Sequence, residues 1–68
     1  MNKQTDDFIK LICQNDDKQI IMNYYNENKE LIDIHANNDE AFRWSCARRH
    51  IEVVKLLLEK GANIHANN

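Results

Sequence analysis

The strongest pattern of apolar and polar positions lies near the end of the chain. Apolar side chains recur there at spacings of three and four residues and form one broad helical face, made by Ile51, Val53, Val54, Leu57 and Leu58. Glu52 stands in the first turn and Lys60 in the last, where each carries the charge that the helix dipole favours. Gly61 follows as the residue best able to end a helix in the left-handed conformation. The pattern predicts a helix over residues 51–60.

A shorter amphipathic segment precedes this helix. Its apolar positions, within residues 40–48, are Ala41, Phe42, Trp44, Cys46 and Ala47. Asn38 or Asp39 can cap its first turn by accepting hydrogen bonds from backbone N–H groups that have no partner inside the helix. So short a helix does not persist alone in water and must pack against its neighbour. We therefore expect a helix pair joined by a turn at residues 48–50.

The first half of the chain repeats this pair at an offset of 33 positions. The offset pairs Ile9 with Phe42, Leu11 with Trp44, Cys13 with Cys46, Ile20 with Val53, Ile21 with Val54, and Tyr24 with Leu57. It predicts helices over residues 5–14 and 18–27, with capping as the expected role of Asp6, Asp7, Asp16 and Asp17. The motif Ile-His-Ala-Asn-Asn at residues 34–38 also recurs at residues 64–68. Internal repeats of this size are typical of stacked repeat proteins.

Residues 50–64 resemble the second half of an ankyrin repeat. They read His-Ile-Glu-Val-Val-Lys, Leu-Leu-Leu-Glu-Lys and Gly-Ala-Asn-Ile, and the family pattern is a His-Leu-Glu-Val-Val-Lys helix followed by Leu-Leu and Gly-Ala-Asp. The resemblance implies an all-α fold, an ankyrin-repeat solenoid of two stacked helix-turn-helix units with short finger turns. Residues 1–33 would form a divergent N-terminal capping repeat. Residues 34–68 would form a full repeat that ends at the start of a further finger turn.

The second helix pair departs from the family pattern in its first turn and in the turn between its helices. Glu40-Ala41-Phe42-Arg43 replaces the family's Thr-Pro-Leu-His, so the hydrogen bonds that brace that turn in the family are not expected. Arg49 stands where the family prefers Gly between the two helices. A left-handed conformation costs about 1–2 kcal/mol for a residue that has a Cβ, so a rebuilt turn is the expectation there.

Charge and composition exclude several classes of function. The nine Lys and Arg residues and eleven Asp and Glu residues give a net charge of −2. Neither half of the chain is basic enough for phosphate binding, so we expect no nucleic-acid or membrane partner. The longest apolar run is Leu56-Leu57-Leu58, far short of a membrane span. Two cysteines without a signal peptide favour free thiols in a reducing compartment, and a cytoplasmic location is expected.

The candidate chemical groups do not form a catalytic or metal site. His35, His50, His65, Cys13 and Cys46 include no pair at the spacing of zinc ligands, so no metal and no cofactor is expected. Cys46 and His50 share a helical spacing that a nucleophile and its base could use. A turn is expected between them, however, and buried structural roles are favoured for both cysteines. The chain is not expected to be an enzyme.

A protein-binding surface is the functional interpretation that remains. In the ankyrin arrangement Trp44 tends to face the concave groove, where it would anchor a partner, although a core position is an equal alternative. Arg43 and Arg48 flank it and could meet an acidic partner, or else form a solvated helix end. Asn37, Asn38 and Asp39 would offer polar groups from the finger turn.

The identity of the partner is not encoded in an obvious way. The richness in Asn, Ile and Lys and the Asn-rich finger segments look like the ankyrin repeats of giant amoebal DNA viruses, which would imply a host protein as partner in the host cytoplasm. A structural alternative is a unit of a longer ankyrin array with no partner of its own. In that case Ile51, Val54 and Leu58 would lack a covering helix pair, and self-association through this uncapped repeat would be expected.

Overall fold

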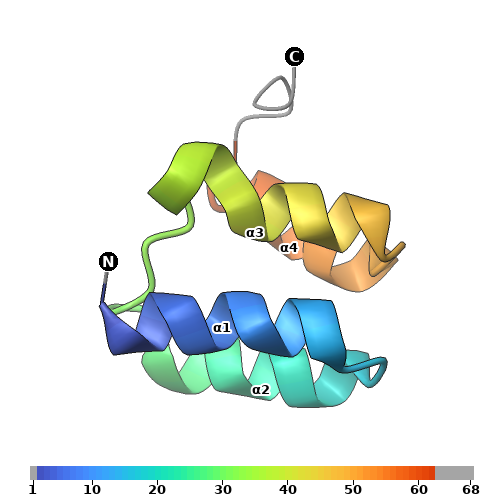
Figure 1. Cartoon of the computed structure of the whole chain (residues 1–68), viewed down its shortest axis with the longest axis horizontal. Coiled ribbons are helices and arrows are strands. Elements are labelled where there is room, and N and C mark those ends of the chain that lie inside the picture. Colours follow the sequence, from blue (N-terminus) through green and yellow to red (C-terminus); the bar gives the residue numbers. More distant parts are fainter. Residues whose placement is uncertain (1, 63–68) are drawn as a thin grey trace.

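The structure, a computed structural model, describes residues 2–62 and folds them into four helices (Figure 1). These are α1 (Lys3–Gln14), α2 (Lys18–Asn28), α3 (Ala36–Ala47) and α4 (Ile51–Glu59), and no strand occurs within residues 2–62. The predicted all-α fold and its four helices are confirmed. The second copy of the Ile-His-Ala-Asn-Asn motif lies outside the described residues.

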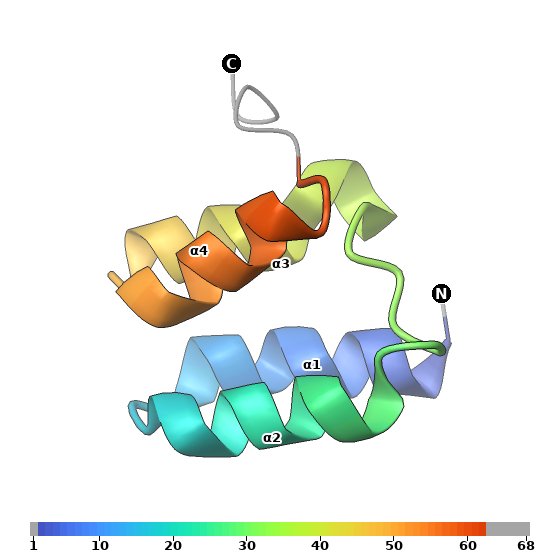
Figure 2. The same cartoon turned by 180° about the vertical axis from the view of Figure 1, so that it is seen from behind.

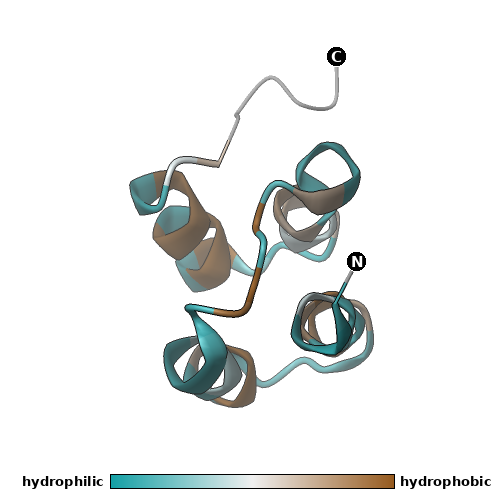
Figure 3. Cartoon of the chain, turned by 90° about the vertical axis from the view of Figure 1, so that its left-hand side faces the viewer, coloured by the Kyte–Doolittle hydropathy of each residue, from teal (hydrophilic) through white to brown (hydrophobic). Residues whose placement is uncertain are grey.

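The helices form two antiparallel pairs, one lying on the other. α1 and α2 make the first pair and α3 and α4 the second; α1 packs against α3, and α2 packs against α4 (Figures 1 and 2). Seen end-on, the four helices stand at the corners of a square (Figure 3). The starts of α2 at Lys18 and α4 at Ile51 keep the predicted offset of 33 positions. The second pair is therefore a structural repeat of the first.

A single apolar core joins the two pairs. Its buried side chains come from all four helices and from the linker between α2 and α3, and they are Phe8, Ile9, Ile12, Ile21, Tyr25, Ile32, Ile34, Ala41, Phe42, Val53 and Leu57. The rings of Phe8 and Tyr25 pack at 5.5 Å between centroids, tilted by 47°. Each fully buried large apolar side chain contributes about 1.5–3 kcal/mol relative to its exposed state. Because the core is shared, the two pairs fold as one unit.

The linker between α2 and α3 is fastened to the beginning of α1. Asn2 caps α1 by accepting from the Thr5 backbone N–H at 2.8 Å, and its Nδ2 donates to the Leu31 carbonyl at 2.6 Å. The buried Thr5 hydroxyl oxygen accepts from the Asp33 N–H at 2.8 Å. The linker's two isoleucines are buried, and Figure 3 shows its apolar part running between the pairs. These bonds hold the second pair in place over the first.

The turn between α3 and α4 keeps the left-handed residue of the usual helix-ending motif. Arg49 has φ of +59°, its N–H donates to the Cys46 carbonyl at 3.1 Å, and the His50 N–H donates to the Ser45 carbonyl at 2.9 Å. This pair of bonds is the Schellman motif, with Arg49 at the position that glycine prefers. The expectation of a rebuilt turn is therefore wrong, because the two backbone bonds retain the strained conformation despite the Cβ.

His50 connects this turn to the first helix pair. Its ring is buried, and Nε2 lies 3.1 Å from the Ile12 carbonyl oxygen in α1, an arrangement in which Nε2–H donates. α4 then ends at a second Schellman motif, in which Gly61 has φ of +98° and the Ala62 N–H donates to the Leu57 carbonyl at 2.9 Å. The predicted role of Gly61 is confirmed.

Replacing Arg49 with glycine should stabilise the chain. Glycine removes the left-handed penalty of about 1–2 kcal/mol, and its greater freedom in the unfolded chain offsets part of that gain, so Arg49→Gly should raise the free energy of unfolding by about 0.5–1 kcal/mol. Urea titration followed by circular dichroism measures the change. Arg49→Ala is the control, since it removes the charge and keeps the Cβ. Equal stability of the two variants would contradict a strained turn.

Candidate functional site

The candidate site lies on the exposed side of α3. Trp44 is 41% exposed, which decides between its two predicted positions: it belongs to the surface and not to the core. Its indole lines a shallow depression of about 320 Å³ together with Glu40, Arg43 and Ala47. An exposed tryptophan beside an arginine is the kind of group that anchors protein interfaces.

A left-handed turn precedes the regular part of α3. Asn37, Asn38 and Asp39 have φ of 57°, 59° and 57° and lie inside the bounds of the helix, so its right-handed part begins at Glu40, as the sequence predicts. Three consecutive left-handed residues are rare, because each costs about 1–2 kcal/mol before compensation. Asn and Asp tolerate this conformation better than other residues with a Cβ, since their short polar side chains bond to nearby groups.

Arg43, one helical turn later in α3, stabilises the left-handed turn at residues 37–39. Its Nη2 donates to the Asn37 carbonyl oxygen at 2.7 Å, and its Nε donates to the Asn38 carbonyl oxygen at 3.1 Å. The planar guanidinium bridges two carbonyls that a right-handed helix would not present together. The prediction of a solvated helix end is therefore wrong for Arg43, which has a structural role within the site.

Asp39 stabilises the turn from inside. It is buried, and its carboxylate Oδ1 lies 2.9 Å from the Nδ1 atom of His35, the residue that precedes α3. Asp39 was predicted either to cap the helix or to face a partner as part of the finger turn. Its burial removes it from the accessible surface, whereas Asn37 and Asn38 remain exposed.

Glu40 orients the tryptophan. One carboxylate oxygen accepts from Trp44 Nε1 at 3.2 Å, and the other accepts from Asn37 Nδ2 at 2.9 Å. The indole N–H is thus directed toward α3's own first turn, which leaves the ring beside the depression. The sequence analysis missed Glu40 as a site residue, although its position four residues before Trp44 was the available signal.

Arg48 lies outside the depression and connects the two helix pairs. Its Nη2 donates to Asp16 Oδ1 at 2.7 Å, across the turns that end α1 and α3. Asp16 therefore forms an ion pair and does not cap α2. Asp17 has the predicted capping role, because its side chain accepts from the Gln19 N–H at 2.9 Å. Since the Asp16 side chain is almost fully exposed, the pair contributes little stability, of the order of 1 kcal/mol or less.

The two cysteines occupy equivalent repeat positions in different environments. Cys13 is partly buried in the first pair, whereas Cys46 is exposed, so the prediction that both are buried is wrong for Cys46. Burial raises the pKa of the Cys13 thiol; the negative charge of Glu40 adds to this effect and the positive charge of Arg48 opposes it. Cys13 thus lies within electrostatic reach of the candidate site.

Neither a metal site nor a membrane-spanning helix occurs within the described residues. Within residues 2–62, no group of three or more His, Cys, Asp and Glu side chains is placed to hold a metal ion. Among the same residues, every helix falls short of the length and apolar character needed to cross a bilayer.

The second helix pair is similar to a known protein family. Residues 37–68 match the family model of the ankyrin repeat, a span just under half of the chain that contains α4, nearly all of α3 and every candidate contact residue. Searches of curated proteins and of solved structures found no match. The ankyrin resemblance read from residues 50–64 is thereby supported for the second pair.

Removing the Arg43 guanidinium should loosen the left-handed turn. Arg43→Ala leaves the Asn37 and Asn38 carbonyls without their two donors, so amide hydrogen exchange over residues 37–40 should become several-fold faster, with an overall loss of stability of about 1–2 kcal/mol. Arg43→Lys is the matched control, since it keeps the charge and loses the bridging geometry. It should give an intermediate result. Unchanged exchange in Arg43→Ala would show that the turn holds without the guanidinium.

The Cys13 thiol should react slowly with alkylating agents. A raised pKa lowers the thiolate fraction at any pH below it, and the thiolate is the reactive form. In a Cys46→Ala variant at pH 8, iodoacetamide should modify Cys13 more slowly in the folded chain than in the same chain unfolded in urea. The rate for the folded chain should still be increasing with pH at values above 9.0, the ordinary pKa of the thiol. A folded rate that levels off below pH 9 would contradict the raised pKa.

Proposed function

We propose that this chain is an ankyrin-repeat protein that binds a partner protein without covalent chemistry. The match to the family model over the second pair supports this proposal, because the ankyrin repeat is a protein–protein interaction module. The observation that carries the proposal is the exposed indole of Trp44 beside its depression, on the matched segment. The contacts would come from Trp44, Arg43, Arg48, Asn37 and Asn38.

The arginines and the tryptophan of this surface would contribute to binding in different ways. Arg43 is engaged by two backbone carbonyls and Arg48 by Asp16, so a partner gains full charge interaction from either arginine only by competing with those acceptors. The ring of Trp44 requires no such exchange. An apolar or aromatic partner side chain in the depression, with acidic groups toward the arginines, fits this arrangement. Tryptophan is among the residues that dominate binding energy at interfaces.

The domain organisation belongs to the same proposal. Residues 1–33 would act as a divergent N-terminal repeat that covers one side of the full repeat at residues 34–68. The first pair repeats the second in helix position and shares its core, which supports this division. A source in a giant amoebal virus, a host partner and a cytoplasmic location remain predictions from the sequence. The absence of enzymatic activity is likewise a prediction from the sequence. The proposed module would act by binding alone.

Capture experiments with Trp44 variants test the function. The purified chain, immobilised and exposed to lysate, should retain a defined partner, and the affinity of the recombinant partner should fall by at least about tenfold in Trp44→Ala. Interferometry over a partner concentration series measures the change.

Leu31→Ala is the matched control for Trp44→Ala. Leu31 is a similarly exposed large apolar residue in the linker, and its removal should leave the affinity unchanged. The proposed surface would be wrong if Trp44→Ala bound as tightly as Leu31→Ala. Circular dichroism should show that both variants keep the helical content of the parent chain.

A further inference from the structure

Side chains at equivalent repeat positions of α2 and α4 differ in their burial, and the differences follow a consistent pattern. Ile20 in α2 is 45% exposed, whereas its counterpart Val53 in α4 is completely buried. Tyr24 in α2 is likewise partly exposed, whereas its counterpart Leu57 is completely buried. This side of the helix is therefore open in the first pair and covered in the second.

The adjacent side of the same helices shows the opposite difference. Tyr25 in α2 is 5% exposed, whereas its counterpart Leu58 in α4 is 39% exposed. Ile21 and its counterpart Val54 differ in the same sense, as do Cys13 and Cys46 in the first helices of the pairs. This second side is covered in the first pair and open in the second.

These differences in burial arise because one helix pair stacks on the other. Each pair has a leading face, made by Ile20 and Tyr24 in the first pair, and a trailing face, made by Cys46, Val54 and Leu58 in the second. Inside the chain, the trailing face of the first pair packs on the leading face of the second. The first pair's leading face and the second pair's trailing face lack a matching pair within the described residues.

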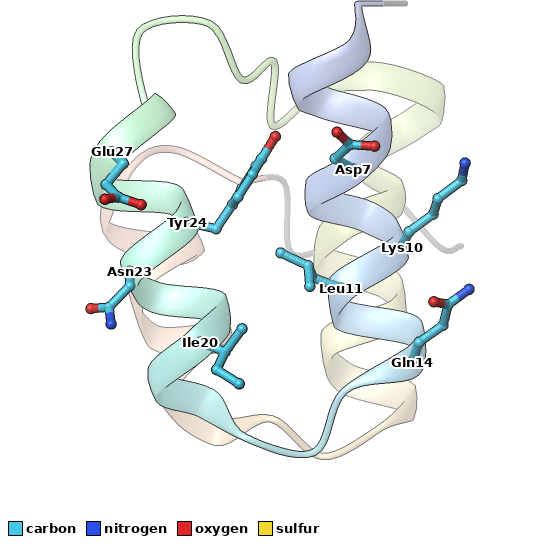
Figure 4. A pocket seen from close by; sticks show the side chains of 8 residues that line it. All are labelled: Asp7, Lys10, Leu11, Gln14, Ile20, Asn23, Tyr24 and Glu27. Carbon is cyan, nitrogen blue, oxygen red and sulfur yellow. The ribbon is translucent and has the colours of Figure 1, made fainter.

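The open leading face forms a groove. It has a volume of about 540 Å³, lies between α1 and α2, and opens on the side turned away from α3 and α4 (Figure 4). Leu11, Ile20 and Tyr24 line it, with polar and charged side chains at its edges. Ile20 and Tyr24 occupy the repeat positions whose counterparts in the second pair, Val53 and Leu57, are buried against the first pair. Leu11 adds apolar surface to the groove from α1.

We propose that a second copy of this chain covers the groove, with the trailing face of one copy on the leading face of the next. Such a contact continues the interface that the chain already contains, with the same repeat positions in the same order. It goes beyond the proposed partner binding, because it uses the ends of the stack and leaves the Trp44 side surface unused.

The charges at the turns favour this orientation. Within the chain, stacking brings the α3–α4 turn to the α1–α2 turn, where Arg48 meets Asp16. The same stacking between copies brings Arg49 of one copy toward Asp16 and Asp17 of the next. With the turns at the same end, two leading faces in contact would bring aspartates together, and two trailing faces would bring arginines together. Head-to-tail contact is therefore the electrostatically favoured arrangement.

A head-to-tail contact has a defined consequence for assembly. The two faces differ, so a contact between copies leaves one open face at each end, and stacks grow unless rotation closes them. Light scattering of the full chain should show a mass that at least about doubles between about 10 µM and about 1 mM protein.

Two face variants provide the decisive test. Ile20→Asp places a charge in the leading face and Leu58→Asp places one in the trailing face; both parent side chains are substantially exposed, so both variants should fold. Every head-to-tail contact between identical copies of either variant includes one altered face, so each variant alone should remain monomeric. A mixture combines the intact trailing face of the first variant with the intact leading face of the second. It should form a one-to-one dimer that does not grow.

Three outcomes would overturn the proposal. The first is a wild type that remains monomeric up to about 1 mM. The second is association of either single variant, and the third is a mixture of folded variants that fails to dimerise. A contact between two like faces would leave one single variant dimeric, which separates that arrangement from the proposed one. Neither variant alters Trp44 or Arg43, so failure of stacking leaves the partner-binding proposal to its own test.

Discussion

The packing of the first helix pair on the second is the interaction on which the rest of this structure depends. The helices are nine to twelve residues long, a length at which isolated helices do not persist in water. Their stability comes from one core to which α2 contributes Ile21 and Tyr25 and α4 contributes Val53 and Leu57. The linker bonds to the start of α1 and the contact of His50 with the Ile12 carbonyl fix the relative position of the pairs.

Both ends of α3 are fixed by left-handed residues that local bonds sustain. Arg43 and the contact between His35 and Asp39 support the turn at residues 37–39, and the Schellman bonds support Arg49 at the other end. These bonds define the length and direction of a helix whose own propensity is weak. Trp44 lies between the two ends, so its exposure and its bond to Glu40 depend on both of them. The strained residues at the two ends of α3 thus flank the exposed surface around Trp44.

Periodicity predicted the fold well because it records which helix faces are buried. The four helices, the offset of 33 positions and the role of Gly61 all follow from apolar spacing and local turn chemistry. The left-handed turn at residues 37–39 could not be predicted in this way, since its support comes from a side chain one helical turn later. The ion pair of Arg48 with Asp16 joins residues 32 positions apart, and no local pattern encodes it. Cys46 was assigned to the interior because cysteine on an apolar helix face usually behaves as a small hydrophobe. It lies instead on a face that no further pair covers within the described residues.

The fold separates two kinds of surface that carry different physical demands. The end faces carry the repeat positions of the internal interface, and the proposed second copy would cover them. The side surface around Trp44 combines an aromatic ring with engaged arginines, and in the proposed function it would bind a different partner. If copies stack through their ends, each added copy presents another Trp44 surface. A partner with several matching segments would then bind at an effective concentration set by the repeat spacing, which strengthens binding without any new contact.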